Sequence, residues 1–338
     1  MTTMRFRHRT TLILTICLMV IGYSSLYGAA LEEYLGKWSL HLPTGAGWLD
    51  IRQENGHLDA DVLWIGGSVV PVDHIYYADG KIYIQRLARK PVAVSSDRTH
   101  QPTNYLELEA SGTKLIGRYV EPANDGHGAK STVFYGTRIP PLPDPPDLSA
   151  VTFDDPISLF DGKSLNGWTA IPSERKSAWQ VNEGVLINDP AAVSDDDHPR
   201  TANLRSDAVF EDFNLTLEVN IPKGSNSGVY LRGIYEVQVM DSYQMELDNH
   251  HMGALYSRIK PEVAAELAPG VWQTLDLTLC DRHLTVVLNG KTIIDNQPIE
   301  GVTGGALSAD QFAPGPIYLQ GDHGKVRYRN IILRTIIK

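Results

Sequence analysis

The densest group of side chains able to do chemistry lies near the C-terminus, in the run from Gln320 to Ile331. Ten residues of this run contain five groups that bind ligands or transfer protons: Gln320, Asp322, His323, Arg327 and Arg329. Two glycines, Gly321 and Gly324, predict a sharp turn among them. A strand that ends in such a turn can hold a polar site on a rigid β-frame. This run is therefore the first candidate segment of a functional site.

Two further polar clusters precede this run. The loop from Gly224 to Gly228 is made of small residues, includes Asn226, and leads into a strand that reaches Arg232. In the next segment, period-two alternation places Glu236 and Gln238 on one face of a strand and Asp241 on the other. A strand face with Glu and Gln is ordinary if it meets solvent or forms the floor of a site.

Each cluster also has a purely structural interpretation. Arg232 and Glu236 could form a cross-strand ion pair on an exposed sheet, worth about 0.2–1 kcal/mol. The loop before the strand could be a simple turn. Asp322-His323-Gly324 could be the tip of a surface hairpin.

The clearest domain boundary is rich in proline. Residues 140–146 contain five prolines in seven positions, which excludes a helix or a central strand. Such a segment favours an extended, semi-rigid spacer. The sequence therefore predicts a linker at 140–149 between one domain at 31–139 and another at 150–338.

Both predicted domains have the patterns of all-β proteins. The first has turn signals such as Asp79-Gly80 between short alternating runs, which predicts a small β-barrel or β-sandwich with an accessory role. In the second, apolar and polar residues alternate from Phe213 to Ile221, and Asn289-Gly290 predicts a hairpin. One short helix is expected over Pro261–Leu267. Many short strands without helical crossovers indicate antiparallel sheets packed face to face.

The first thirty residues have the pattern of a secretory signal peptide. Three arginines, at positions 5, 7 and 9, precede an apolar run from Thr11 to Ile21, and Gly28-Ala29-Ala30 suits a cleavage site. The apolar run is short for a membrane span, although an uncleaved anchor stays an alternative. We expect an exported protein, periplasmic or extracellular, without stable membrane insertion after cleavage.

Charge and cysteine content narrow the choice of partners. Removal of residues 1–30 takes away three arginines and no acid, so the formal net charge falls from −10 to −13. Nucleic acid and anionic membranes are therefore poor partners, whereas a neutral sugar is compatible. Only Cys280 remains after processing, which excludes an intrachain disulfide.

Ordered matches across the second domain identify a family. Residues 157–336 resemble the 3-keto-disaccharide hydrolase domain, a former domain of unknown function. The matching segments, in order, are Leu159–Trp168, Trp179–Val181, Gly184–Leu186, Asn226–Gly233, Tyr235–Ser242, Gly253–Tyr256, Pro269–Gln273, Ile317–Gly324 and Val326–Ile331. The resemblance implies a concanavalin A-like jelly-roll sandwich that is exported and acts on an oligosaccharide or glycoside oxidised at C3.

The implied substrate suggests a mechanism. A ketone at C3 makes the C2 proton acidic, so a base can remove it, the C1–O bond can break by β-elimination, and water can add back. Such a site needs a base, an electrophile at the C3 oxygen and an acid for the leaving oxygen. We expect Glu236 to act as base or acid, with Arg232 and His323 stabilising the oxyanion. The side chains expected to bind or orient the sugar are Asn226, Gln238, Asp241, Gln320, Asp322 and Arg329.

No cofactor is firmly implied, and the metal content is left open. His, Asp and Glu in the candidate site could hold a divalent cation as the electrophile. Asp195–His198 could help to bind Ca²⁺, although a solvated acidic loop explains the same residues.

Two other functions compete with a 3-keto-glycoside hydrolase or lyase. A non-catalytic, lectin-like module shares the jelly-roll fold but should present exposed aromatic platforms, whereas Trp168, Trp179 and Trp272 occupy positions typical of a core. A conventional glycosidase needs paired carboxylates about 5–9.5 Å apart. Glu236 and Asp241 would lie about 16 Å apart on opposite faces of a straight strand, so they are a poor pair.

Overall fold

A computed structural model describes residues 31–88, 90–193 and 200–337. The predicted signal peptide and the acidic segment Asp195–His198 lie outside the described residues. Within the described ranges, no helix has the length and apolar character needed to cross a membrane. Strands dominate throughout, which confirms the predicted all-β class.

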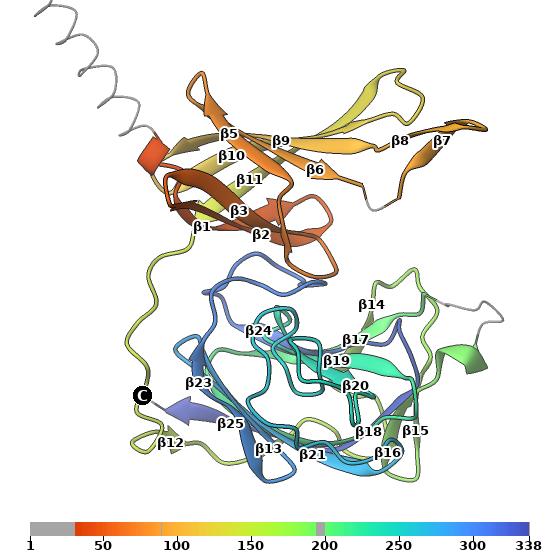
Figure 1. The fold of residues 1–338 in the computed structure, drawn as a ribbon. Coiled ribbons are helices and arrows are strands. Elements are labelled where there is room, and N and C mark those ends of the chain that lie inside the picture. Colours follow the sequence, from red (N-terminus) through yellow and green to blue (C-terminus); the bar gives the residue numbers. More distant parts are fainter. Residues whose placement is uncertain (1–30, 89, 194–199, 338) are drawn as a thin grey trace, which may run out of the picture. The chain divides into compact units, whose positions relative to one another are not determined.

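The chain falls into two compact units (Figure 1). One contains the described residues up to Trp38 together with Asp50–Asp61 and Pro71–Arg138. The other contains Ser39–Leu49, Val62–Val70 and Ile139–Lys338.

The strands before the proline-rich segment form one nine-stranded sheet rather than the two sheets of a sandwich. Its order is β4-β3-β2-β1-β11-β10-β9-β6-β5, and β7 pairs with β8 separately. The bounds are β1 Gly36–Leu42, β2 Gly45–Glu54, β3 His57–Trp64, β4 Val70–Pro71, β5 His74–Ala78, β6 Lys81–Leu87, β7 Val92–Ser95, β8 Arg98–His100, β9 Thr103–Ser111, β10 Lys114–Pro122 and β11 Ala129–Arg138. Asp79 and Gly80 both have positive φ and close the β5–β6 hairpin, as their sequence predicts.

After the proline-rich segment the strands form two sheets. The larger has the order β15-β16-β25-β18-β21-β22-β23, with β12 and β13 also paired to β25, and the smaller has the order β14-β17-β24-β19-β20. The bounds are β12 Thr152–Phe153, β13 Ile157–Ser158, β14 Trp168–Ile171, β15 Trp179–Asn182, β16 Val185–Asn188, the 3₁₀ turn η1 Pro190–Ala192, β17 Asn203–Phe210, β18 Phe213–Asn220, β19 Asn226–Leu231, β20 Tyr235–Met240, β21 Trp272–Cys280, β22 His283–Leu288, β23 Lys291–Pro298, β24 Gly315–Leu319 and β25 Val326–Ile337.

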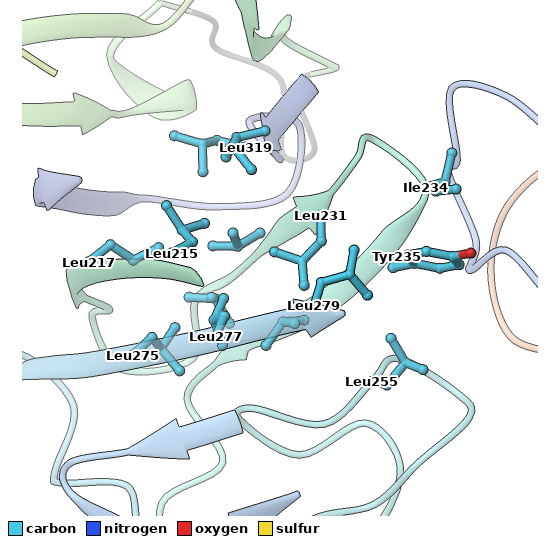
Figure 2. Packing of buried hydrophobic residues seen from close by; sticks show 14 of the residues in the cluster. Leu215, Leu217, Leu231, Ile234, Tyr235, Leu255, Leu275, Leu277, Leu279 and Leu319 are labelled. Atoms are coloured by element: carbon cyan, nitrogen blue, oxygen red, sulfur yellow. The ribbon is translucent and has the colours of Figure 1, made fainter. Parts of the chain in front are cut away.

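An apolar layer holds these two sheets face to face. The alternation predicted for Phe213–Ile221 is confirmed in β18, where Leu215 and Leu217 point inward, and Leu277 lies beside them on β21. From the smaller sheet, Leu231 and Leu319 join the same cluster (Figure 2). Burial of this apolar surface favours folding by about 25 cal/mol per Å². The result is the predicted jelly-roll sandwich.

The prediction of a helix at Pro261–Leu267 was wrong, because this segment is irregular. The side-chain amide of Gln273 takes the place of helical bonds at its end. It accepts a hydrogen bond from the Leu267 N–H and donates one to the Leu267 carbonyl, each at 2.8 Å. The Glu262 N–H donates to the carbonyl of Ile293. Backbone groups here are satisfied by neighbouring strands, so the segment needs no helix.

We expect Leu277→Ala to lower the free energy of unfolding by about 2–5 kcal/mol, because it leaves a cavity in the sandwich core. Leu277 is fully buried, whereas Ile332 on β25 is 37% exposed. Urea denaturation of both alanine variants checks this. An Ile332→Ala loss as large as that of Leu277→Ala would contradict the assigned core.

Candidate functional site

The smaller sheet of the sandwich has one apolar face and one polar face. Val229, Val237 and Leu319 point into the core. Alternation therefore turns their neighbours to the opposite side. We call this side the polar face; its side chains are Asn203, Tyr230, Glu236, Gln238, Tyr318 and Gln320.

The pairing of β19 with β20 places Glu236 on this face. Tyr230 is the cross-strand partner of Glu236, and Gly228 is the partner of Gln238. A Cβ atom at Gly228 would lie 2.3 Å from Oε1 of Glu236, so the carboxyl group occupies the space over this glycine. The backbone N–H of Glu236 donates to the Thr303 hydroxyl at 2.8 Å. Glu236 is only 3% exposed.

Burial controls the protonation of Glu236. Loss of water contact raises its pKa to about 8, although a hydrogen bond with the Tyr230 hydroxyl favours the carboxylate, and the negative charge of Asp322 adds to the rise. Glu236 is therefore mostly protonated at neutral pH. A carboxyl group in this state can act as a general acid.

Two tyrosines and an asparagine line the face beside Glu236. The Tyr230 hydroxyl donates to the carbonyl of Gly304 at 2.8 Å, and its ring meets that of Tyr318 edge-to-face at 4.7 Å. The Asn203 side-chain amide donates to the Tyr318 hydroxyl at 2.6 Å. Burial raises the pKa of both tyrosines, so they stay protonated as hydrogen-bonding groups.

Two amide oxygens near this face have no hydrogen-bond partner within the described part of the chain. They are Oδ1 of Asn226 and Oε1 of Gln320, and both are buried. The Gln320 N–H donates to the carbonyl of Gly228, which places Gln320 next to the glycine beneath Glu236. Buried acceptors without donors are costly, so they suit a ligand that brings hydroxyl groups.

Asp322, His323 and Arg175 form the exposed rim of the polar face. Nδ1 of His323 donates to Oδ1 of Asp322 at 2.9 Å, and Arg175 donates to Oδ2 at 3.2 Å. Burial opposes ionisation of Asp322, but the bond and charge of His323, with the charge of Arg175, lower its pKa overall. Side-chain exposure rises from 20% at Asp322 to 48% at His323. The rim thus combines an ionised carboxylate with an accessible imidazole.

The turn that carries this rim is fixed by side chains. The carbonyl of Gly321 accepts hydrogen bonds from Asn188 and Thr201, and the Gly321 N–H donates to Asn203. A Cβ at Gly321 would lie 2.4 Å from the carbonyl oxygen of Ala202, so only glycine fits. After this turn the chain passes from β24 in the smaller sheet to β25 in the larger one. The C-terminal run is therefore divided between two sheets.

Arg329 lies on the larger sheet, away from the polar face. It forms an ion pair with Glu218 of β18 at 2.5 Å, and its guanidinium lies 4.1 Å from the centroid of the Trp272 ring. Its neighbour Tyr328 is buried in the core, so Arg329 points outward on that sheet. The structure does not bring Arg329 together with Glu236.

Arg232 and Asp241 anchor loops at the two ends of the β19–β20 hairpin. The Arg232 guanidinium donates to the carbonyls of Gln311 at 2.7 Å and Ala313 at 2.5 Å. It also lines a cavity of about 270 Å³ with Asp212 and Arg282, outside the polar face. Asp241 accepts a hydrogen bond from the Gly224 N–H at 2.8 Å. These contacts give both residues a structural role, because their side chains hold the backbone of neighbouring loops.

Sequence reasoning missed Tyr230, Tyr318, Asn203 and Arg175. Tyr230 was within reach, because it shares the alternation of Asn226 and Gly228 and pairs with Glu236 across a short loop. Tyr318 precedes Gln320 by two positions and therefore points to the same face of the strand. Arg175 stands in a segment with no motif, and nothing in its local sequence points to Asp322.

The rim offers a poor fit for a divalent cation as it stands. Both oxygens of Asp322 already accept hydrogen bonds, from His323 and from Arg175, so a cation would have to displace a guanidinium. Among the described residues, one group of three potential ligands has its ligand atoms within 4.8 Å of one another, namely Asp212, Cys280 and Asp281. None of these three belongs to the polar face.

The candidate site is thus a buried, protonated carboxyl group surrounded by side-chain amides and hydroxyls on one sheet of a jelly-roll sandwich. Residues 155–334, more than half of the chain, match the 3-keto-alpha-glucoside-1,2-lyase-like domain, and the chain belongs to this family. This confirms the resemblance seen in the sequence.

Known relatives match parts of the chain. A 3-keto-disaccharide hydrolase of Bacteroides thetaiotaomicron is 30% identical over 81 residues, which cover 24% of this chain and 28% of that protein. The match thus spans less than a third of that relative. Two solved structures of candidate glycosyl hydrolases from Parabacteroides distasonis share 27% and 24% identity, with TM-scores of 0.44 and 0.41. They cover 58% and 54% of this chain, and 93% and 100% of their own chains.

We expect Gly228→Ala to displace the Glu236 carboxyl group, because the new methyl would overlap Oε1. The pKa of Glu236 should then fall from about 8 towards its ordinary value as the group moves into water. Carbon-13 NMR titration of glutamate carboxyls, assigned with Glu236→Gln, measures this. Gly66→Ala is the control, since a Cβ there meets nothing within 4 Å. An unchanged titration in Gly228→Ala would contradict the placement of Glu236.

Proposed function

We propose that this protein is an exported enzyme that cleaves the glycosidic bond of glycosides oxidised at C3. Membership of the 3-keto-alpha-glucoside-1,2-lyase-like family and the partial match to a 3-keto-disaccharide hydrolase support the substrate class. The proposed export rests on the basic and apolar segments of residues 1–30. The observation that carries the chemistry is the buried Glu236, protonated at neutral pH, beside the partly buried Asp322 and the exposed His323.

The reaction follows from the acidity that a C3 ketone gives to the C2 proton. A base takes this proton, and the electron pair moves to the C3 oxygen as an enediolate. The C1–O bond then breaks, the leaving oxygen accepts a proton, and a C1–C2 double bond remains. Water adds to this double bond and gives the free 3-keto sugar. One base, one acid and hydrogen-bond donors at the C3 oxygen are sufficient.

The residues of the polar face and rim match these roles. In the neutral ring that donates its Nδ1 proton to Asp322, Nε2 keeps a lone pair, and this form of His323 can serve as the base. Glu236, protonated at neutral pH, is the acid for the leaving oxygen. The two groups sit in different environments, one exposed and one desolvated, which is how a site separates base from acid.

Side-chain amides supply donors and acceptors for the sugar. Among the described residues, the Gln238 amide nitrogen donates one hydrogen bond, to the Met240 sulfur at 3.6 Å, and so has a second donor hydrogen for the C3 oxygen. Asn226 and Gln320 offer unpartnered oxygens to sugar hydroxyls. In this assignment Arg232 supports the hairpin and the polar face supplies the oxyanion donors.

A lectin-like module is the weaker alternative. Trp168 and Trp179 are buried, at 7% and 6% exposure, and Arg329 lies over the ring of Trp272. These are not the open aromatic platforms expected of a sugar-binding surface. Binding alone also needs no desolvated acid, which is costly to maintain.

We expect the purified protein to cleave a 3-keto-glucoside and to leave the unoxidised parent glucoside intact, because only the ketone acidifies the C2 proton. Product analysis by mass spectrometry after incubation with each compound measures this. Cleavage of both at similar rates would indicate a conventional glycosidase. Binding of the 3-keto-glucoside without cleavage would favour the lectin-like module.

We expect kcat/KM for the 3-keto-glucoside to fall as the pH rises above about 8, because Glu236 then loses the proton it must donate. Glu236→Gln should lower kcat by about 10²–10⁴-fold and remove this alkaline limb. A matched variant, His323→Ala, should cause a similar loss, whereas His57→Ala in the first unit should not. A rate that rises through pH 8 would instead assign Glu236 as the base.

A further inference from the structure

Three buried polar side chains form a cluster that the proposed reaction does not use. They are Ser242, His251 and Glu266, whose exposures are 2% for Ser242 and 3% and 4% for the side chains of His251 and Glu266. The Ser242 hydroxyl donates to Oε2 of Glu266 at 2.8 Å and accepts a hydrogen bond from the Met252 N–H at 2.9 Å. One serine thus ties Glu266 to the segment that follows His251.

His251 and Glu266 face each other with unsatisfied atoms. Nε2 of His251 lies 3.9 Å from Oε1 of Glu266, and neither atom has another hydrogen-bond partner among the residues described. The His251 ring bonds to the carbonyl of Glu246, and Nδ1 must be the donor because Nε2 is unpartnered. In the neutral ring Nε2 then carries a lone pair. Two acceptors therefore face each other, and one proton between them would satisfy both.

The cluster holds the segment that covers the edge of β20, the last strand in its sheet. The Gly253 N–H donates to the Gln238 carbonyl, the Gln238 N–H to the Ala254 carbonyl, and the Tyr256 N–H to the Glu236 carbonyl, each at 2.9 Å. Leu255 also forms a bridge with Val237. Residues 251–256 thus act as an extra strand beside both polar-face residues of β20.

We propose that Ser242, His251 and Glu266 form a clamp that shares one buried proton and, by holding residues 251–256 on β20, positions Glu236 and Gln238. The proton resides on Oε1 of Glu266, which faces Nε2 of His251 across 3.9 Å, while Oε2 accepts from Ser242. Approach of the two side chains to hydrogen-bond distance then satisfies every polar atom of the cluster. Loss of the proton leaves a buried carboxylate against a lone pair, and the segment is released. The clamp residues are positioning residues, because they act through the backbone of β20.

The charges around the clamp agree with a neutral pair. Burial, against the hydrogen bond from Ser242 and with the negative charge of Asp241, raises the pKa of Glu266 to about 7. Burial lowers the pKa of His251, against the Glu246 carbonyl and the charge of Asp248. The raised Glu266 pKa gives stability that is complete below its unfolded value of about 4.5 and is lost as pH rises through 7. The lowered His251 pKa acts in the opposite direction, below about 6.5.

Hydrogen exchange of the full-length protein without substrate tests the clamp. Between pH 7 and 8, below most of the titration of Glu236, protection of amides in residues 236–240 and 253–256 should fall by up to about tenfold after correction for intrinsic exchange. In Glu266→Gln the amide donates to His251 throughout this range, so the part of the fall that Glu266 causes should be lost. Glu236→Gln should keep the wild-type pH dependence, which separates the clamp from Glu236 itself. Glu218→Gln, on the larger sheet, is the matched control and should behave as wild type.

Kinetics supply a second readout, which rests on the proposed function. Glu266→Ala should lower kcat for the 3-keto-glucoside by about tenfold with little change in KM, and Glu266→Gln should restore it. The clamp is overturned if Glu266→Gln retains the wild-type pH dependence of exchange, or if Glu266→Ala leaves protection unchanged. An inactive wild type with the expected exchange pattern would instead refute the proposed function and leave the clamp standing.

Discussion

The structure of the second unit depends on one constraint, the removal of a carboxyl group from water on the outer face of a sheet. Burial of Glu236 disfavours its charged form against the hydrogen bond with Tyr230, and the side chain fits in the space over Gly228. Both contacts follow from the register of β19 with β20. A slip of one residue would turn Glu236 into the apolar core. The bonds from Arg232 to the carbonyls of Gln311 and Ala313 fix the loop that sets this register.

The same constraint explains why β20 is supported on both sides. On one side β19 supplies a regular ladder, and on the other residues 251–256 supply three backbone hydrogen bonds. Glu266, which accepts a hydrogen bond from Ser242, is a second buried acid with a raised pKa. In the roles we propose, two buried carboxyl groups with raised pKa values serve one strand: Glu236 is the acid, and Glu266 holds the strand in place. Activity and local stability should respond to pH through different groups.

A gradient of exposure runs from Glu236 to the rim. Glu236 is buried and protonated, whereas Asp322 is ionised and hydrogen-bonded to an accessible His323. The negative charge of Asp322 also raises the pKa of Glu236, so the buried carboxyl group and the rim are electrostatically linked. This separation suits a reaction that removes a proton from one carbon and delivers a proton to a leaving oxygen.

The sequence by itself determined the local features, because they depend on neighbouring residues. Alternation predicted β18 and paired Glu236 with Gln238 on one face, Asp79-Gly80 and Asn289-Gly290 predicted hairpins, and ordered motifs identified the family. Tertiary structure decided which segments meet. The run from Gln320 to Ile331 looked like one site, but Asp322 lies in the turn that follows β24 of the smaller sheet, whereas Arg329 lies on β25 of the larger one. Arg175 donates a hydrogen bond to Asp322, which lies 147 positions later in the sequence. The side chain of Gln273 hydrogen-bonds the backbone of Leu267, where the sequence predicted the end of a helix. Contacts between distant segments are set by sheet pairing and packing, which local patterns do not encode.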